Sequence, residues 1–513
     1  MALIATLFMI NGGLTHISCA EEAPPETSAV LTSIRTFADN LIAHGRDGYG
    51  PKHTPLFVCQ LDIATKKIPP AKSMFYAQER NRGGARSTAN NLQFDSGLVR
   101  LLEGLTELDF GPQYRAAARE YLAYYFEHLP DPKHGLWPWG DHRGYDVVAD
   151  KTIRGYHEFK VMNPPWDVYW TVNSNAVMRA IEGLHLHIFD PRKSYGFNRH
   201  YPSRNPYTNS MMSSGGAWIA SWAYLYGKTG DPKYLDWAEK MDAYLWSLRN
   251  PKTDLLASHP ADPAYPAWRK YHGGRRATRT EYMAQLIFYA HNLLIAADRL
   301  GPEKGKPFRE HALRYVRSFI RHMDIRDGSF FATFELASGK PLFPRITDGW
   351  EFVPQMNDKY KWGNRVLGIR APVSIAYAFR VTGEADLREA FDALLPLYRM
   401  EQFTADAARA DLPAGLIAET MTSFIDMYKG TRDAEYLGRA ETLGAHAMKH
   451  YYVDGWFVAG PPVLERHKDK QVDGWTTYAN RGGSAELALA LLRLTLVREG
   501  KGDFLGDNPR SYF

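Results

Sequence analysis

The sequence predicts an all-α protein, an (α/α) toroid or barrel of helical hairpins, from a recurring turn, long amphipathic segments and scarce strand signals. Four segments each combine a helix end, a short turn containing Gly with Asp or Glu, and a new amphipathic helix. Gly can end one helix in a left-handed turn, and the acidic residue can cap the next. The helical hairpin is therefore the expected repeating unit. The four turns lie at 104–109, 226–231, 381–384 and 427–433.

Helical spacing of apolar residues continues between these turns, as in 282–290 and 485–492. The clearest strand pattern is 329–335, followed by a turn at 338–340, which predicts one minor β-hairpin on the helical body. No low-complexity linker divides 21–513, so we expect a single domain there. A superhelical solenoid of the same hairpins is the competing architecture.

The composition excludes several classes of protein. With 513 residues, 45% hydrophobic and 23% charged, the chain is neither disordered nor a coiled coil. A net charge of +5 without a long basic block does not indicate a nucleic-acid partner. No apolar run approaches the roughly 18 residues of a membrane span, so none is expected. The two cysteines, Cys19 and Cys59, cannot form a disulfide framework.

The N-terminus resembles a secretory signal peptide. Residues 1–20 contain no Asp, Glu, Lys or Arg, and they end in small residues before an acidic, proline-containing segment. This pattern predicts cleavage after Ala20 and a secreted or periplasmic protein. A frayed native N-terminus and a lipoprotein attached through Cys19 are the alternatives.

Two predicted loops, 136–146 and 163–170, are rich in Trp and Tyr beside Asp, Asn and His. Flat rings next to hydrogen-bonding groups suit sugars, because a pyranose offers an apolar face and equatorial hydroxyls. The loops therefore favour carbohydrate binding. The alternative is that the rings only pack these large loops.

Three loops between 139 and 201 supply candidate metal ligands, namely His142, Glu158 and His200. Two imidazoles and one carboxylate can bind a divalent transition metal and leave positions open for water and substrate. Mn, Ni, Co and Zn suit such a donor set about equally. Any single histidine is weak evidence, because the chain has 18.

These three residues, with Arg199 directly before His200, resemble the pattern of polysaccharide lyase family 2. That family comprises metal-dependent pectate lyases with an (α/α) barrel, and a neighbouring uronate lyase family could share the site. The resemblance implies that His142, Glu158 and His200 bind the metal and that Arg199 is the catalytic base. It also implies a catalytic domain over 21–513 and an acidic polysaccharide or oligosaccharide as substrate, most of all pectate or polygalacturonate.

The resemblance further implies a second catalytic arginine downstream. The sequence offers Arg275, Arg276 and Arg279, and we favour Arg279 because it begins a helical pattern. A substrate clamp by Arg82 or Arg86 is a further possibility beside simple helix capping.

The chemistry of β-elimination can be stated independently of the family. Removal of the C5 proton of a uronate requires neutralisation of the adjacent C6 carboxylate, which a metal and an arginine can supply. A guanidinium normally stays protonated, so a base role for Arg199 is unusual. Tyr145, His157 and Tyr201 are alternative bases, with Arg199 then purely electrostatic.

Two other functions fit the same architecture. An inverting glycoside hydrolase would use a carboxyl pair, such as Asp95 with Glu281 or Asp348 with Glu351. A carbohydrate-binding protein without catalysis would need only the aromatic loops. The aromatic and polar loop 473–483 is a candidate sugar subsite or a structural element.

Overall fold

The computed structural model describes residues 27–69, 87–153, 155, 157–159, 164–200, 202, 210–264, 277–280, 289–350, 352–353, 366–367, 371–404, 412–460 and 474–502. The side chains of 352–353 and 366–367 are not part of that description. The predicted signal peptide therefore lies outside the described residues. So do Arg82, Arg86, Tyr201, Arg275, Arg276, Glu281 and Glu351.

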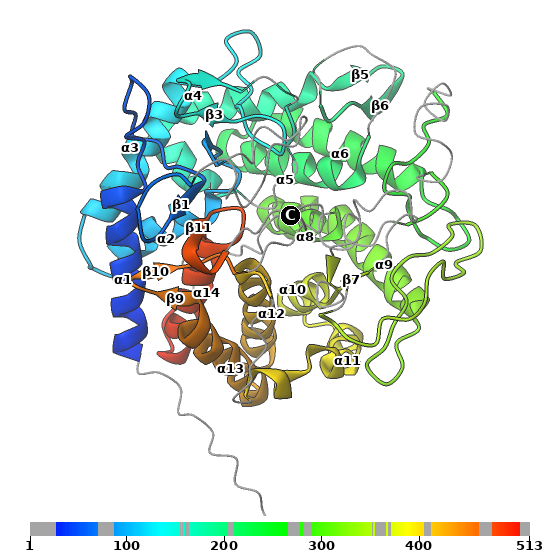
Figure 1. The fold of residues 1–513 in the computed structure, drawn as a ribbon. Helices are drawn as coiled ribbons and strands as arrows, with labels where there is room; N and C mark the ends of the chain where they lie inside the picture. The colour runs from blue at the N-terminus through cyan, green and yellow to red at the C-terminus, as the bar shows by residue number, and fades with distance from the viewer. Residues whose placement is uncertain are drawn as a thin grey trace, which may run out of the picture.

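A ring of inner helices surrounds the centre of the molecule (Figure 1). Around the ring, α5 packs on α8, α8 on α10, α10 on α12, α12 on α14, and α14 on α2. The contact between α14 and α2 joins the last helix to the first inner one. The array is therefore closed, which confirms the (α/α) toroid and excludes the open solenoid. The inner helices are α2 (Ser96–Glu107), α5 (Met212–Thr229), α8 (His291–Lys304), α10 (Ala371–Thr382), α12 (Ala414–Thr431) and α14 (Ser484–Arg498).

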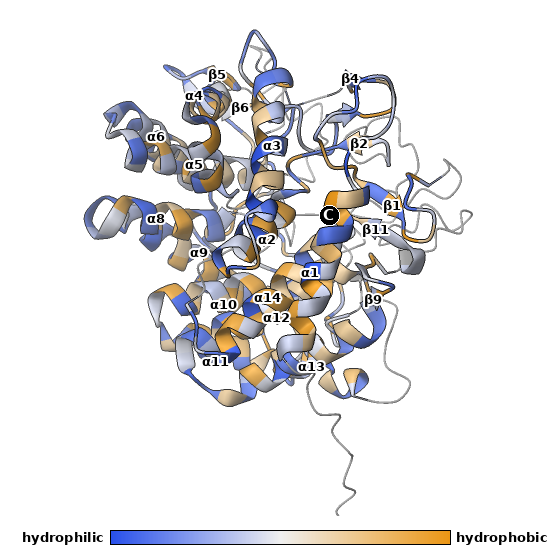
Figure 2. Ribbon diagram, turned by 90° about the vertical axis from the view of Figure 1, so that its left-hand side faces the viewer, coloured by the Kyte–Doolittle hydropathy of each residue, from blue (hydrophilic) through white to orange (hydrophobic). Residues whose placement is uncertain are grey.

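Outer helices cover this ring, and each packs against an inner partner. Figure 2 shows more hydrophilic residues on outer helices such as α6 and α11 than on inner ones such as α14. An additional helix, α4 (Trp166–His185), lies between α3 and α5 and is kinked at Asn173. The outer helices are α1 (Thr27–His44), α3 (Gln113–His128), α6 (Pro232–Ser247), α9 (Lys306–Met323), α11 (Ala385–Ala393) and α13 (Ala434–Tyr451).

Two of the predicted turns form at the predicted glycines, although Glu384, unlike Asp231, makes no side-chain capping hydrogen bond. Gly230 ends α5 with φ +70°, and the Asp231 side chain accepts a hydrogen bond from a backbone amide in the first turn of α6. Gly383, with φ +72°, separates α10 from α11. These positive φ angles are the conformation in which Gly has no Cβ penalty.

The other two turns use different residues from those predicted. Asp433 caps α13 as expected, but the left-handed residue before it is Arg432, whereas Gly430 lies inside α12. Gly104 lies inside α2, and Asp109 adopts the left-handed conformation instead. Asp and Asn tolerate this conformation better than other residues with a Cβ. The prediction was thus right about where helices turn and wrong about which residue turns them.

Strands are short and pair in small antiparallel groups. At the predicted hairpin, 329–335, the structure forms only isolated bridges, such as Phe330 with Ile346 and Phe334 with Pro341, in place of a regular ladder. The strands are β1 (Gln60–Asp62) with β11 (Thr477–Ala479), β2 (Ala89–Asn90) with β3 (Tyr145–Asp146) and β4 (Lys151–Thr152), β5 (Ile188–Asp190) with β6 (Ser194–Phe197), β7 (Phe352–Val353) with β8 (Val366–Leu367), and β9 (Tyr452–Val453) with β10 (Trp456–Phe457). Short 3₁₀ helices span Leu395–Tyr398, Met400–Phe403 and Gly474–Thr476.

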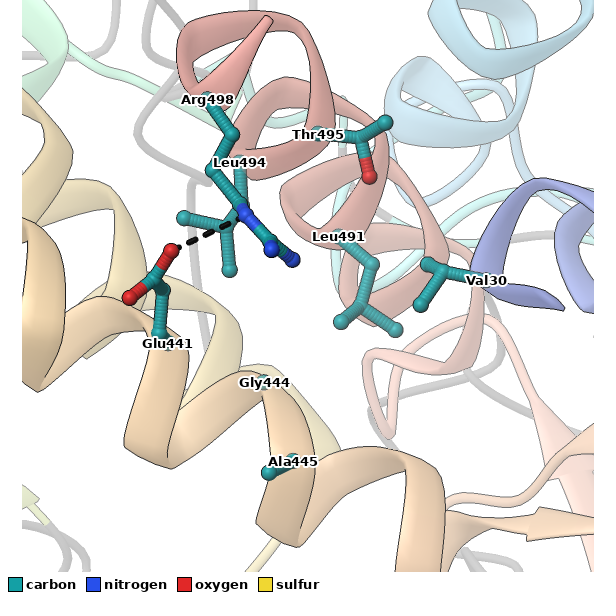
Figure 3. Close-up of a pocket in the computed structure, with 8 residues that line it drawn as sticks. All are labelled: Val30, Glu441, Gly444, Ala445, Leu491, Leu494, Thr495 and Arg498. Carbon is teal, nitrogen blue, oxygen red and sulfur yellow. Dashed lines mark ion pairs between the residues drawn. The ribbon is translucent and has the colours of Figure 1, made fainter. Parts of the chain in front are cut away.

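A small pocket lies between α1, α13 and α14 (Figure 3). The cavity there holds about 20 Å³, and Glu441 and Arg498 form an ion pair of 2.9 Å at its edge. Such a volume has room for about one water molecule. Among the described helices, none is long and apolar enough to cross a membrane.

Buried polar contacts join the two ends of the ring at Asp95. Its carboxylate accepts hydrogen bonds from Asn480 Nδ2 at 2.7 Å, Tyr121 OH at 2.8 Å and Asn90 Nδ2 at 3.2 Å. Asn480 comes from the C-terminal part of the chain, and the others come from its beginning. Burial raises the pKa of Asp95 to about 7, although these donors favour the ionised form.

The raised pKa of Asp95 predicts a specific pH dependence of stability. A raised pKa means that the folded state binds the proton more tightly, so this contribution is present below about pH 4 and is lost as the pH rises through about 7. The full effect is on the order of 4 kcal/mol. We expect Asp95→Asn to flatten the fall in melting temperature between pH 4 and pH 8, measured by calorimetry against the wild type. An unchanged slope would contradict this role of Asp95.

Candidate metal centre

The predicted aromatic loops form part of the core. Trp137, Trp139 and Trp166 are buried, and Trp139 stacks on Phe159 with ring centroids 4.9 Å apart. Because these rings are covered by protein, they cannot stack on a sugar. For these tryptophans the packing interpretation is correct, and the packed rings fix the segments that carry His142 and Glu158.

Close backbone packing brings these two segments together. Gly140 has φ +94°, and a Cβ at this position would lie 2.4 Å from the backbone oxygen of Glu158. A Cβ on Gly155 would lie 2.1 Å from the backbone oxygen of His142. The Asn91 side-chain amide donates to the backbone oxygens of Gly140 and Arg143, at 2.8 and 3.1 Å. Both segments therefore need glycine, because no side chain fits between them.

The third segment follows the β5–β6 hairpin. The backbone amide of His200 donates to Asn198 Oδ1 at 3.0 Å. His187, which is fully buried, donates through Nδ1 to the backbone oxygen of Asn198 at 2.6 Å. Burial lowers the pKa of His187 to about 4, so it is a neutral imidazole. These contacts fix the turn that presents Arg199 and His200.

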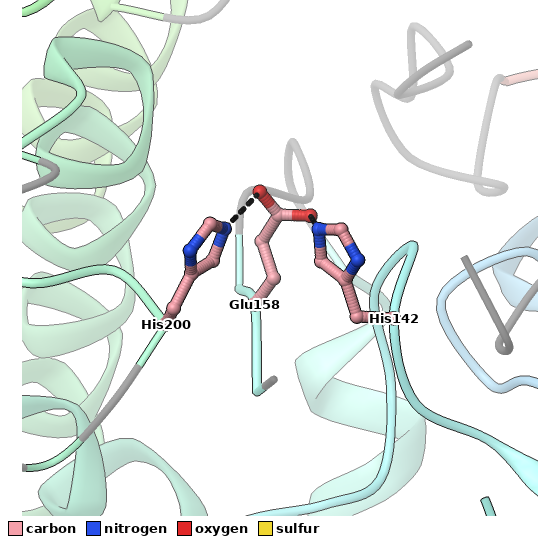
Figure 4. A group of neighbouring side chains, drawn as sticks. All are labelled: His142, Glu158 and His200. Carbon is pink, nitrogen blue, oxygen red and sulfur yellow. Dashed lines mark hydrogen bonds and ion pairs between the residues drawn. The ribbon is translucent and has the colours of Figure 1, made fainter. Parts of the chain in front are cut away.

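The three predicted ligands converge (Figure 4). His142 Nε2 lies 3.7 Å from Glu158 Oε2, and His200 Nε2 lies 3.3 Å from Glu158 Oε1. One donor atom from each residue falls within 4.8 Å of the others. The Glu158 side chain is fully buried between the two imidazoles, which keep 13% and 16% of their surface exposed.

This donor set fits a divalent first-row cation. Ligand bonds of about 2.1 Å place neighbouring donor atoms about 3.0–3.4 Å apart. The two imidazole–carboxylate separations, 3.3 and 3.7 Å, are close to this range, and all three donor atoms lie within 4.8 Å of one another. Nitrogen and oxygen donors in a mixed set are those that such ions accept. Burial, followed by the charge of Arg199, lowers the pKa of His200 to about 4, so its imidazole is neutral, the form that binds metals.

Arg199 lies beside the cluster, as predicted. Its Nε donates to Glu158 Oε1 at 2.7 Å and to His200 Nε2 at 3.2 Å. Its Nη1 contacts His259 Nε2 at 3.0 Å. Sequence reasoning missed His259, because it lies 60 residues after Arg199 and no motif marks it.

Residues 54–218 match the family model of the periplasmic pectate lyases. The chain resembles this family over that segment. His142, Glu158, Arg199 and His200 all lie within it, whereas Arg279 and His259 lie outside. The match confirms the resemblance drawn from those residues and indicates a carbohydrate-active enzyme.

Solved structures with low identity cover most of the chain. A sugar epimerase from a ruminal bacterium is 12% identical, with a TM-score of 0.49 over 93% of this chain and 99% of that one. An unsaturated glucuronyl hydrolase specific for heparin is 13% identical, with a TM-score of 0.46 over 92% and 98%. A family 76 glycoside hydrolase (mannosidase) from Bacteroides thetaiotaomicron is 11% identical, with a TM-score of 0.43 over 92% and 100%.

The structure gives Arg279 and the alternative bases different surroundings. Arg279 is half-buried and forms a backbone bridge with Glu335, and its assignment to the site stays a prediction. Tyr145 is buried with its hydroxyl 3.4 Å from Asp150, and burial raises its pKa. His157 is buried against Trp139, and burial lowers its pKa well below the usual value. These surroundings favour structural roles for Tyr145 and His157.

The carboxyl pairs of the hydrolase alternative gain no support. Asp95 is fully buried and accepts the hydrogen bonds that join the ends of the ring. Asp348 accepts a hydrogen bond from the backbone amide of Trp350 at 2.8 Å, as in a local turn. Their proposed partners, Glu281 and Glu351, lie outside the described residues.

Arg481, in the loop predicted as a sugar subsite or structural element, supports the segment that carries the candidate ligand His142. Arg481 forms a buried ion pair of 3.2 Å with Asp141, the residue before His142, and each side chain is 3% exposed. The guanidinium also lies 5.3 Å from the ring centroid of Phe94. This arginine therefore has a structural role, because it holds the segment that presents His142.

The close packing at Gly140 yields a test of the cluster. Gly140→Ala adds a Cβ at a positive φ and against the backbone oxygen of Glu158, so it should displace Glu158 from His142. We expect Mn²⁺ affinity, measured by isothermal titration calorimetry, to fall about 10- to 100-fold. Gly438→Ala is the matched control, because a Cβ there meets nothing within 4 Å. Equal affinities for both variants would argue against this geometry.

Proposed function

We propose that the protein is a metal-dependent polysaccharide lyase that cleaves an acidic, uronate-containing glycan, most of all pectate or polygalacturonate, by β-elimination. The observation that carries the proposal is the convergence of His142, Glu158 and His200 beside Arg199, within the segment that matches the periplasmic pectate lyases. A protein that only binds sugar has no need of this arrangement.

In this proposal His142, Glu158 and His200 hold one divalent transition metal ion. When bound, the ion supplies positive charge that neutralises the C6 carboxylate and makes the C5 proton removable. The buried carboxylate of Glu158 balances much of that charge, and it also orients Arg199 through the 2.7 Å hydrogen bond. The His142 and His200 side chains stay 13% and 16% exposed, so a substrate carboxylate can reach them from solvent.

Arg199 acts on the substrate itself. A guanidinium can pair with the uronate carboxylate through two hydrogen bonds. The resemblance assigns it the base role as well, in which a neutral guanidine nitrogen takes the C5 proton. The C5–H electron pair then forms the C4–C5 double bond and the C4–O4 bond breaks. The departing oxygen is protonated from solvent, so the chain is cut without addition of water across the bond.

We further propose that Arg279 completes the site, that residues 1–20 are a signal peptide, and that the enzyme works in the periplasm or outside the cell. The family description as periplasmic supports this location. The acidic polysaccharide would then be met outside the cytoplasm.

The proposed reaction is tested with purified protein and polygalacturonate. We expect ultraviolet absorbance from a conjugated, unsaturated uronate, loss of activity on chelation, and recovery with Mn²⁺, Co²⁺, Ni²⁺ or Zn²⁺. His200→Ala should lower activity more than about 100-fold, since even residues that only support a metal ligand contribute 10- to 100-fold. His44→Ala, on an exposed helix end, is the control and should keep full activity.

The same assay separates the alternatives. Release of reducing ends without this absorbance would show that the protein hydrolyses the glycan and is not a lyase. Full activity after exhaustive chelation would remove the metal from the mechanism. Full activity of Arg199→Ala would remove Arg199 from both of its proposed roles.

A further inference from the structure

A buried pair, Ser258 and His259, lies on the segment that follows α6, and the family match does not reach it. The two residues are 1% and 2% exposed. Ser258 Oγ lies 2.8 Å from His259 Nδ1, and His259 Nε2 lies 3.0 Å from Arg199 Nη1. A guanidinium can only donate hydrogen bonds, so His259 Nε2 accepts. In a neutral imidazole Nδ1 then carries the proton and donates to Ser258.

Arg199 shares acceptors with the proposed metal. Its Nε donates to Glu158 Oε1 and His200 Nε2, and both residues are proposed ligands. The single lone pair of His200 Nε2 cannot accept a hydrogen bond and bind a cation together. The bond from Nε to His200 must therefore break when the site is loaded. The bond from Nη1 to His259 does not compete with the cation and can persist.

We infer that His259 is a positioning residue. It holds the Arg199 guanidinium at Nη1 when the hydrogen bond from Nε to His200 is replaced by the metal. Ser258 Oγ accepts a hydrogen bond from the proton that Nδ1 carries in this tautomer. His259 is buried, so it acts through Arg199 and does not touch the substrate. The inference rests on the proposed lyase function and adds a residue that the resemblance does not assign.

The test compares two variants of the full-length protein. His259→Phe keeps most of the side-chain volume and removes the acceptor, whereas His259→Gln keeps an acceptor oxygen near the position of Nε2. We expect His259→Phe to lower kcat on polygalacturonate about 10- to 100-fold, with KM and Mn²⁺ affinity changed less than about 3-fold. His259→Gln should recover most of kcat. In an Arg199→Lys background, His259→Phe should cost less than about 3-fold, because the group it holds is gone.

The matched control is His446→Phe. His446 is 2% exposed, lies on α13 and packs its ring against Phe403 with centroids 5.0 Å apart. It should keep wild-type kcat.

Each remaining outcome overturns the inference. Wild-type kcat in an active His259→Phe variant would leave the proposed lyase function unaffected and would rule out the positioning role of His259. Equal losses in the Phe and Gln variants, or a parallel loss of Mn²⁺ affinity, would show that His259 only supports the local fold. A wild type without lyase activity would overturn the function and the inference together, and calorimetric Mn²⁺ binding by that protein would show whether the metal site survives the failure.

Discussion

The fully buried carboxylate of Glu158 is the interaction on which the site depends. Burial of an isolated negative charge is strongly unfavourable unless positive or hydrogen-bonding groups surround it. Here Arg199 donates to it at 2.7 Å, and His142 and His200 flank it. The three loops that carry these residues must therefore keep fixed positions relative to one another. The positive charge of a bound cation would meet the same requirement, so Arg199 and the proposed metal would share partners.

Closure of the helix ring holds the His142 loop in its position. Residues shortly before α2 and α14 contact the loop that carries His142, and the first residue of α5 hydrogen-bonds to Ser258 beside His259. Asn91 holds the His142 loop from the first part of the chain, and Arg481 holds it from the last through the buried pair with Asp141. The β1–β11 pairing and the hydrogen bond from Asn480 to Asp95 join the same two ends. A closed toroid thus positions a loop that neither half of the chain could fix alone.

The sequence predicted the helical hairpins because turn chemistry is local, as at Gly230 and Asp231. It predicted His142, Glu158 and His200 through a resemblance, since the spacing of residues in three separate loops contains little physical information. Burial was harder to predict. Trp137 and Trp139 are of a residue type that often stacks on sugars. In the structure they pack against each other and against the core. His259 and the Asp141–Arg481 pair escaped prediction because their partners are distant in sequence. His259 meets Arg199 where the segment after α6 returns to the start of α5, and Asp141 meets Arg481 where the two ends of the ring join.

The most direct measurement is a crystal structure of the protein soaked in Mn²⁺, with anomalous data collected to locate the ion. We expect one anomalous peak at about 2.0–2.2 Å from His142 Nε2, a Glu158 oxygen and His200 Nε2, with Arg199 Nε moved away from His200. An ion bound elsewhere, or no bound ion, with Arg199 still bonded to both Glu158 and His200, would contradict the proposed metal site.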